Sequence, residues 1–508
     1  MSSRIWIIIA FVIYTLIMLA IGAKFFEKKS NMSNYFLGGR GLNHWVAAIS
    51  AQASDMSGWL LMGLPGAVYA FGTGQLWIAV GLAVGTALNW IIVAKRFRRY
   101  TILAGDSITI PQFFENRYRD KTHIIKIASG VFIAIFFAVY TASGFVSGAT
   151  LFSQVFGIDY TVALVISVAI ILVYTFLGGF SAVSWTDLIQ GLLMLAAIFT
   201  VPILAVVASG GISNVTANIP PQMFNAMTDS SGQPITLVSI ISQLGWGLGY
   251  FGMPHILVRF MAIKSDRSVK KSATIAIVWV AISLTFAVLV GIIGIAFLPD
   301  LAANESETVF IKMIQKVFLD TGAIAPVPII GGLFLCGILA AIMSTADSQL
   351  LVTASALTSD IYRTFDKKAS DNKLVWISRG AVILVALVAF FIATDNNSSI
   401  MGLVSNAWSG FGSAFGALVL FSLFWKRTNG AGAAAGILSG GITVIIWDYV
   451  PLFSAEAGKT LADVTGLYSL VVGFAISAIF IVCVSLLTKT PKEEITLEFE
   501  KVSTMKLD

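Results

Sequence analysis

Long apolar runs with few charges are the feature that most restricts how this chain folds. The clearest runs cover residues 6–23, 188–208, 274–297 and 467–488. A helix needs about 20 apolar residues to cross the hydrocarbon region of a membrane. The pattern therefore predicts an all-α polytopic membrane protein. The first run is not expected to be a cleaved signal peptide, because its positive charges follow the apolar stretch.

Composition supports this class of protein. Of the 508 residues, 57% are hydrophobic and only 11% are charged, against about 25% charged in soluble proteins. This excludes a soluble, disordered or disulfide-rich secreted chain. Two Cys in apolar stretches and three scattered His exclude a structural zinc site. Membrane lipid is the expected environment, and the net charge of +6 does not indicate nucleic acid. No obligatory protein partner is evident.

Nine further segments bring the expected number of transmembrane helices to about thirteen. They are 43–71, 76–94, 127–151, 160–178, 237–258, 326–350, 375–394, 400–425 and 431–449. With thirteen crossings, the outer loops hold only Arg4, Lys312, Lys316 and Lys459 of the 32 Lys and Arg residues. This asymmetry predicts a multi-pass protein of the cell membrane with an outside N-terminus and a cytoplasmic C-terminus. Residues 308–319 are predicted to form an amphipathic helix on the outer surface.

The second span contains a carboxylate near its middle. Asp55 is followed by Ser57 and Gly58 in the sequence ASDMSG, and no Lys or Arg lies within that span. A charged side chain at this depth costs roughly 2.5–3.5 kcal/mol even on the mildest scale, so it needs a partner. A bound cation is the partner that we favour. The alternative is a carboxylate that caps a short helix.

The seventh span is also predicted to be interrupted. It carries Gly245, Gly247, Gly249, Gly252 and Pro254 within ten residues, and both residue types disfavour a helix interior. Unwound backbone inside a membrane must face protein, water or a ligand. Trp246 and Tyr250 lie one turn apart in this stretch and could contact a ligand or simply pack between helices.

The two interrupted spans are five apart, which is typical of an inverted repeat of five helices. The chain is then a single transporter domain over 1–508. Its first repeat covers 43–208 and its second covers 237–425, with peripheral helices at 6–23 and 431–488. In the ninth span, Ser344 and Thr345 are adjacent hydroxyls among small residues. They could serve a cation or bond to their own helix backbone.

Three further polar residues have two interpretations each. Arg40 lies just inside the membrane and is expected to act as a gate that pairs with a carboxylate, or to face lipid. Asp187 lies at a predicted helix start, where an N-cap is the simpler role. Asp347, three residues after Ser344, is expected to be solvated at a helix end.

Six motifs resemble the sodium:solute symporter family, closest to its proline-transporting branch. They are NYFLGGRGL (34–42), ASDMSGWLLMGLPGAVY (53–69), FLGGFSAVSWTD (176–187), GWGLGYFGMPHILVRFMA (245–262), ILAAIMST (338–345) and SNAWSGFGSAFG (405–416). The resemblance implies a five-plus-five, LeuT-like inverted-repeat core with discontinuous helices. It also implies a secondary active symporter that couples inward Na⁺ movement to L-proline uptake.

The resemblance further implies particular site residues. The Na⁺ ligands would be the carbonyls of Ala53, Met56 and Ala341 with the hydroxyls of Ser344 and Thr345, and Asp55 would supply charge at or beside them. The proline site would be lined by Ser57, Trp59, Tyr140, Trp246, Tyr250 and Pro254. Arg40 and Asp187 match positions linked to the inner gate and to ion coupling.

Other functions are less well supported by the sequence. The alternative within transporters is a symporter of another small solute, or one coupled to H⁺ or Li⁺. An intramembrane enzyme would need a catalytic motif, and neither HExxH nor GxSxG occurs. A sensor would need a signalling domain, and no segment is long enough for one. The protein is therefore expected not to be an enzyme.

Overall fold

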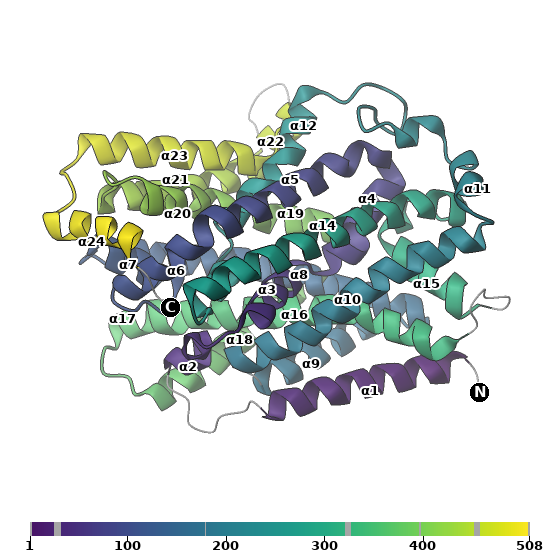
Figure 1. Cartoon of the computed structure of the whole chain (residues 1–508), viewed down its shortest axis with the longest axis horizontal. Helices are drawn as coiled ribbons and strands as arrows, with labels where there is room; N and C mark the ends of the chain where they lie inside the picture. Colours follow the sequence, from purple (N-terminus) through teal and green to yellow (C-terminus); the bar gives the residue numbers. More distant parts are fainter. Residues whose placement is uncertain are drawn as a thin grey trace.

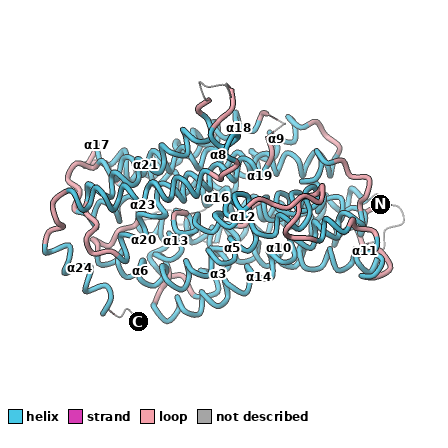
Figure 2. The backbone as a smooth tube through the Cα atoms, turned by 90° about the horizontal axis from the view of Figure 1, so that it is seen from above, coloured by secondary structure: helices cyan, strands magenta, loops and turns pink. Residues whose placement is uncertain are grey.

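A computed structural model describes residues 3–24, 32–177, 179–320, 327–395, 398–451 and 458–505. Over these ranges the elements are helices, and the β pairing consists of two isolated bridges. Most helices run along the long axis of the molecule, and the loops gather toward its two ends (Figures 1 and 2). The boundaries expected at residues 178 and 326 lie outside the described residues.

Ten helices of the described chain are long and apolar enough to cross a membrane, and two shorter apolar helices accompany them. Each of the thirteen expected spans coincides with a helix or with two successive helices. In chain order these are α1 (Ser3–Lys24), α3 and α4 (His44–Asp55, Leu64–Phe71), α5 and α6 (Leu76–Leu88, Ala94–Leu103), α8 (Ile124–Phe156), α9 (Tyr160–Leu177), α10 (Phe180–Ala208), α12 and α13 (Leu237–Leu244, Pro254–Ala262), α14 (Asp266–Phe297), α16 (Pro328–Ser355), α18 (Asp371–Ala393), α19 and α20 (Ile400–Phe411, Ala417–Phe424), α21 (Gly430–Tyr449) and α23 (Ser469–Leu487).

Shorter helices cover the two ends of this bundle. They are α2 (Met32–Leu37), α7 (Ile110–Tyr118), α11 (Ile212–Ala217), α15 (Val309–Phe318), α17 (Arg363–Phe365), α22 (Leu461–Thr465) and α24 (Glu493–Thr504). The helix expected at 308–319 is confirmed as α15. Its apolar side chains, Phe310 and Ile314 among them, are buried against α10, α14 and α16.

The second span is broken directly after Asp55. Helix α3 ends there, Met56 leaves the helical region with ψ of 74°, and the chain resumes as the π-helical turn η2 (Trp59–Gly63) before α4. Gly58 is needed next to the break, because a Cβ there would lie 2.2 Å from Ser147 Oγ on α8. The interruption expected from the sequence is confirmed.

The seventh span is broken as well. Helix α12 continues as the 3-10 turn η6 (Gly245–Phe251), Met253 is extended, and Pro254 is the first residue of α13. Proline suits that position because its missing N–H would have no partner in the helix. A Cβ on Gly247 would lie 2.3 Å from the carbonyl oxygen of Gly81, so glycine allows η6 to approach α5.

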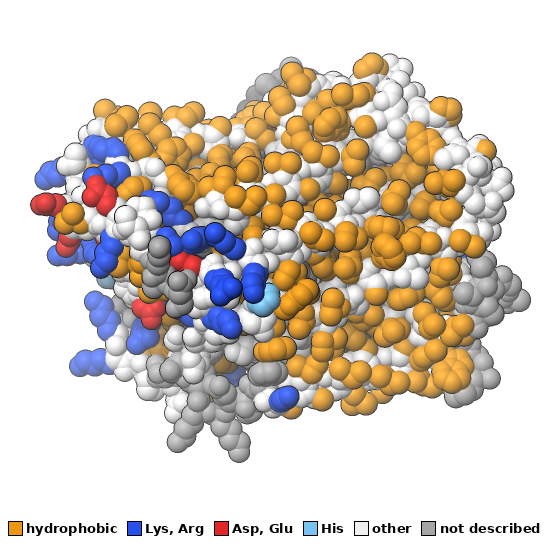
Figure 3. Space-filling model, viewed as in Figure 1, with side chains coloured by type: hydrophobic (Ala, Val, Ile, Leu, Met, Phe, Trp, Pro, Cys, Tyr) orange, Lys and Arg blue, Asp and Glu red, His pale blue; other side chains and the backbone are white. Residues whose placement is uncertain are grey.

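The two broken spans meet at the centre of the bundle. Helix α3 packs against α10, α13, α14 and α16, so the third helix of the second predicted repeat lies against the first broken span, as expected. Hydrophobic side chains cover much of the drawn face, and Lys and Arg gather at the end that holds α6, α7 and α24 (Figures 1 and 3). We call this the basic end.

Candidate functional site

Asp55 is a buried carboxylate at the break of the second span. Its side chain is fully buried, and Oδ2 accepts a hydrogen bond of 2.7 Å from the Tyr250 hydroxyl on η6. Its other oxygen, Oδ1, has no hydrogen-bond partner within the described residues. A buried charged group needs compensation, so this oxygen is open to a cation.

Oxygen atoms from α3 and α16 come together beside Asp55. The Ala53 carbonyl accepts hydrogen bonds from Ser344 Oγ at 2.8 Å and from Thr345 Oγ1 at 3.4 Å. Ser344 Oγ also lies 3.2 Å from the Ala341 carbonyl oxygen. The structure thus brings together Ala53, Ala341, Ser344 and Thr345, whereas Met56 lies in the break itself. Carbonyls freed at helix breaks, with hydroxyls beside them, form an all-oxygen ligand set that suits Na⁺.

Two aromatic side chains contact the break, Trp59 from η2 of the same span and Tyr140 from α8. The carbonyl of Asp55 accepts hydrogen bonds from Trp59 Nε1 at 3.0 Å and from the Tyr140 hydroxyl at 3.2 Å. Ser57, just after the first break, and Pro254, just after the second, are both buried. Asp55 therefore contacts three residues expected for the organic substrate, namely Trp59, Tyr140 and Tyr250.

An aromatic cluster surrounds the unwound part of the seventh span. The Trp246 ring stacks on Tyr468 with centroids 5.3 Å apart, and Trp408 meets Tyr250 edge-on at 5.0 Å. Trp408 Nε1 donates a hydrogen bond of 2.8 Å to the Trp246 carbonyl. Trp408 and Tyr468 were missed by the sequence analysis. The motif SNAWSGFGSAFG contains Trp408, but only its place beside η6 reveals this contact.

A large cavity reaches Trp246 from the end opposite the basic one. Its volume is about 850 Å³, and its wall includes Gly63, Trp246, Glu307 and Met401. Glu307 caps α19, because its two carboxylate oxygens accept hydrogen bonds of 3.0 Å from the N–H groups of Ile400 and Met401. Burial raises the pKa of Glu307, and these two N–H groups oppose that shift. The cavity therefore extends to the aromatic cluster at Trp246.

The structure corrects the interpretation of Asp187 as a helix N-cap. This residue is not an N-cap, because α10 begins at Phe180 and Asp187 lies two turns inside the helix. Its Oδ2 accepts hydrogen bonds from Ser50 Oγ at 2.7 Å and from Arg259 Nη2 at 3.1 Å. Arg259, which the sequence analysis placed among the cytoplasmic basic residues, is 1% exposed on α13. The structure therefore contains a buried ion pair between α10 and the second broken span.

Asp347 also differs from expectation. It is fully buried rather than solvated, because α16 continues to Ser355 and carries it inside the bundle. Its neighbour Ser348 accepts a hydrogen bond of 2.6 Å from Arg259 Nη2. Asp347 Oδ2 has no hydrogen-bond partner in the described part of the chain. One buried guanidinium is thus surrounded by polar groups of α3, α10 and α16.

Arg40 lies nearer the basic end, on the 3-10 turn η1 (Gly38–Arg40). It pairs with Asp106 at 3.0 Å, and it also donates to the Met261 and Ser107 carbonyls at 2.8 Å each. These contacts tie η1 to α13 and to the loop after α6.

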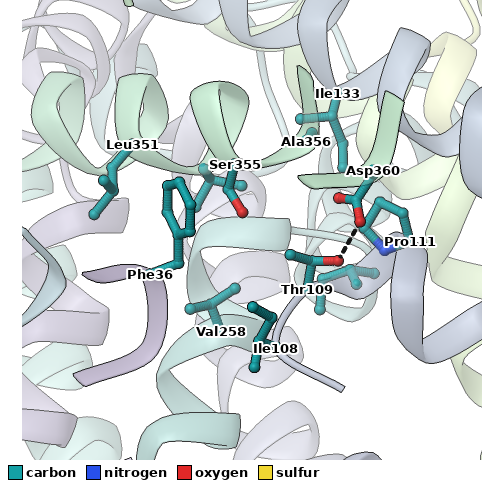
Figure 4. A pocket seen from close by; sticks show the side chains of 12 residues that line it. Phe36, Ile108, Thr109, Pro111, Ile133, Val258, Leu351, Ser355, Ala356 and Asp360 are labelled. Carbon is teal, nitrogen blue, oxygen red and sulfur yellow. Dashed lines mark hydrogen bonds between the residues drawn. The ribbon is translucent and has the colours of Figure 1, made fainter. Parts of the chain in front are cut away.

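A small and mostly apolar pocket lies between the start of α7, α13 and the end of α16. This pocket of about 10 Å³ lies among Phe36, Val258 and Leu351, and its polar contact is the hydrogen bond of 2.7 Å from Thr109 to Asp360 (Figure 4). Such a volume holds about one water molecule. In this conformation the large cavity of about 850 Å³ lies toward the opposite end.

Comparison with known proteins gives a consistent result. The sequence model of the sodium:solute symporter family matches residues 35–440. The high-affinity proline transporter PutP of Bacillus subtilis (strain 168) is 46% identical over 488 residues, which are 95% of this chain and 98% of that protein. A sodium/proline symporter of Staphylococcus aureus is 44% identical over 498 residues, or 96% of this chain and 94% of that one.

Solved structures show the same fold at lower identity. A Na⁺-coupled sialic acid symporter, in a substrate-bound outward-open state, superposes with a TM-score of 0.74 at 21% identity, over 96% of this chain and 99% of that one. A nucleobase-cation-symport-1 family transporter in a closed conformation gives a TM-score of 0.53 at 13% identity, over 93% and 99%.

Proposed function

The chain belongs to the sodium:solute symporter family, and on this basis we propose that it couples the inward movement of Na⁺ to the uptake of L-proline. The observation that carries the proposal is the group of oxygens between α3 and α16. Asp55 Oδ1 is buried without a partner among the described residues, and the Ala53 carbonyl is shared by two hydroxyls of α16. The names of the relatives in Bacillus subtilis and Staphylococcus aureus support proline as the solute.

The Na⁺ ion is held by the carbonyls of Ala53, Met56 and Ala341 and by the hydroxyls of Ser344 and Thr345. Asp55 supplies the negative charge. When the ion binds, the hydroxyls of Ser344 and Thr345 turn their protons away from the Ala53 carbonyl, so that their lone pairs face the ion. Binding then links α3 to α16 and orders the break after Asp55.

Proline is a zwitterion with a small apolar ring. Aromatic faces of Trp246 and Tyr140 suit the ring and attract its ammonium group. Carbonyls exposed at the breaks accept hydrogen bonds from the ammonium, and the exposed helix end beginning at Pro254 suits the carboxylate. Ser57, Trp59 and Tyr250 complete the pocket. Because Asp55 contacts Trp59, Tyr140 and Tyr250, the ion orders the solute site and the solute in turn tightens the ion.

The proposed orientation places the basic end in the cytoplasm and the N-terminus outside. The Lys and Arg residues gathered at one end support it (Figure 3). Na⁺ then enters down the membrane potential, which supplies about 2.3 kcal/mol per charge per 100 mV. Residues 43–208 and 237–425 form the two inverted repeats, which rock against each other. Arg40 and Asp187 belong to the inner gate, because both hold α13 to its neighbours.

Uptake by reconstituted protein tests the function. Proteoliposomes are given labelled L-proline under an inward Na⁺ gradient, and choline replaces Na⁺ in a parallel sample. We expect accumulation only with Na⁺. Accumulation that persists in choline under an imposed pH gradient would favour H⁺ coupling, and competition by another solute with no effect of proline would favour a different substrate within the family.

A further inference from the structure

A polar pocket opens at the basic end, apart from the broken helices. Its volume is about 300 Å³. One wall comes from α7 and the start of α8. The other comes from the π-helical turn η8 (Ala356–Tyr362), which continues α16, and from the residues that follow it. Every described side chain that lines it is polar or charged, so it is unsuited to an apolar ligand.

The charges around this pocket leave an excess of positive charge. Glu115 is the one acidic residue among the described residues of the lining. It is already paired with Lys126 at 2.8 Å and in contact with His123 Nδ1. Arg363 and Lys367 line the same pocket and are solvent-exposed. Neither forms an ion pair within the ranges that the structure describes. Two cations are therefore available to an anion in the pocket.

A buried hydroxyl in the lining is also without a partner. Ser359 is 2% exposed, and its Oγ makes no hydrogen bond to any other described residue. The carboxylate of the next residue, Asp360, is occupied elsewhere: it accepts a hydrogen bond from the Thr109 hydroxyl in the small apolar pocket (Figure 4). A buried hydroxyl that lacks a partner in the protein is satisfied by a ligand or water at the pocket wall.

We propose that this pocket binds a phosphate group. Phosphate has several strong acceptor oxygens, which suit a guanidinium, an ammonium and a hydroxyl together. Arg363, Lys367 and Ser359 supply these three donors. The site lies at the basic end and is separate from the Na⁺ and proline residues, so it does not depend on the proposed transport function.

The phosphate group has two possible sources, a phospholipid of the adjoining leaflet and a free phosphate compound. Phe365 lies in the chain between Arg363 and Lys367 and is 76% exposed. An exposed aromatic ring at the edge of a membrane protein suits the lipid interface, and Lys and Arg near that surface attract anionic headgroups. The geometry therefore favours an anionic phospholipid.

Ligand-dependent unfolding of the purified full-length protein tests this site. The unfolding temperature is measured in detergent against increasing short-chain phosphatidylglycerol, inorganic phosphate, or zwitterionic phosphatidylcholine as a reference. Arg363→Gln/Lys367→Gln removes the two free charges. Arg267→Gln/Lys270→Gln is the matched control, because it removes one Arg and one Lys that are exposed at the start of α14.

We expect phosphatidylglycerol to raise the unfolding temperature, with an apparent affinity about tenfold weaker in Arg363→Gln/Lys367→Gln and unchanged in the control. Ser359→Ala keeps every charge and should weaken binding about fivefold, so it also tests the site if the double variant does not fold. The same pattern with inorganic phosphate would identify a free phosphate compound as the ligand. Equal losses in both double variants, or no response to either probe, would overturn the proposal.

Discussion

At the scale of single residues, the notable feature of this protein is that its interior contains several buried carboxylates. Asp55, Asp187 and Asp347 are all fully buried within the bundle. Each has one oxygen without a hydrogen-bond partner in the described chain. Of these three, Asp187 alone forms an ion pair within the described ranges, with Arg259. Their different surroundings predict different consequences of substitution.

Asp55→Asn should weaken the dependence of uptake on Na⁺. The amide keeps the size of the side chain and can still meet Tyr250, but it removes the negative charge beside the Ala53 carbonyl. We expect the Na⁺ concentration for half-maximal uptake to rise at least tenfold, or about 1.4 kcal/mol of lost interaction. Asp300→Asn, at an exposed position after α14, is the control. An unchanged Na⁺ requirement in Asp55→Asn would remove Asp55 from the ion site.

Trp246→Ala should act on proline more than on Na⁺. Trp246 stacks on Tyr468 at the wall of the large cavity, whereas the proposed Na⁺ ligands lie on α3, on α16 and in the break after Asp55. Loss of the ring should raise the KM for proline by about tenfold, because aromatic contacts contribute about 0.5–1.5 kcal/mol beyond buried area. Trp376→Ala, which removes a ring that is 69% exposed on α18, should change neither constant. A larger effect of Trp246→Ala on Na⁺ than on proline would place Trp246 outside the substrate site.

Arg259→Leu should destabilise the fold strongly. It leaves Asp187 buried without its cation, and breaking a buried ion pair in this way costs about 3–5 kcal/mol. The double variant Arg259→Leu/Asp187→Leu should recover part of that loss, since no charge is then left unpaired. Thermal unfolding in detergent measures both, with exposed Arg267→Leu as the control. Equal unfolding temperatures for Arg259→Leu and the wild type would show that the pair contributes nothing.

These residues also show where sequence analysis succeeds and where it stops. Asp55 could be recognised because a lone carboxylate in the middle of an apolar span needs a partner. Arg259 could not, because it stands close to other basic residues at the end of a span. Its burial follows from the tertiary position of α13. Asp187 was misinterpreted because α10 begins eight residues before the apolar run.

At the scale of elements, the broken spans depend on close backbone contact as well as on flexible residues. The count of Gly and Pro in 245–254 predicted the second break. The close approach of η6 to α5 was not predictable, because it depends on Gly81 and Gly85 of another helix. Both glycines lie in an uninterrupted apolar run that gives no local signal.

Gly247→Ala should therefore destabilise the protein. The added methyl group would lie 2.3 Å from the Gly81 carbonyl oxygen, and overpacking of this kind costs about 1–3 kcal/mol. Gly380→Ala on α18 is the matched control, because a Cβ there meets no atom within 4 Å. It should be neutral or slightly stabilising, since Ala favours helix over Gly by about 1 kcal/mol. Similar unfolding temperatures for the two variants would mean that η6 does not need the close contact.

At the scale of the whole molecule, α24 connects parts of the chain that are far apart in sequence. Glu498 pairs with Arg119 after α7 at 2.6 Å, and Glu500 pairs with Lys426 in the loop before α21. The Phe499 ring lies 4.9 Å from the guanidinium of Arg96 on α6, and Val502 is fully buried. Helix α24 thus links α6, the end of α7 and the loop before α21 at the basic end.

Phe499→Ala/Val502→Ala should release α24 without unfolding the bundle. The two truncations shorten a ring that packs on Tyr100 and Arg96 of α6 and a fully buried side chain of α24. The Lys426–Glu500 pair is about half exposed, where such a pair contributes about 0–1 kcal/mol. We expect faster amide hydrogen exchange in α24 and in the α20–α21 loop, with exchange in α3 and α16 unchanged. Leu497→Ala, at a side chain that is 57% exposed on the same helix, is the matched control. Because local opening reports local stability, unchanged exchange in the double variant would show that α24 is held by its charges, and that the basic end is fastened electrostatically rather than by packing.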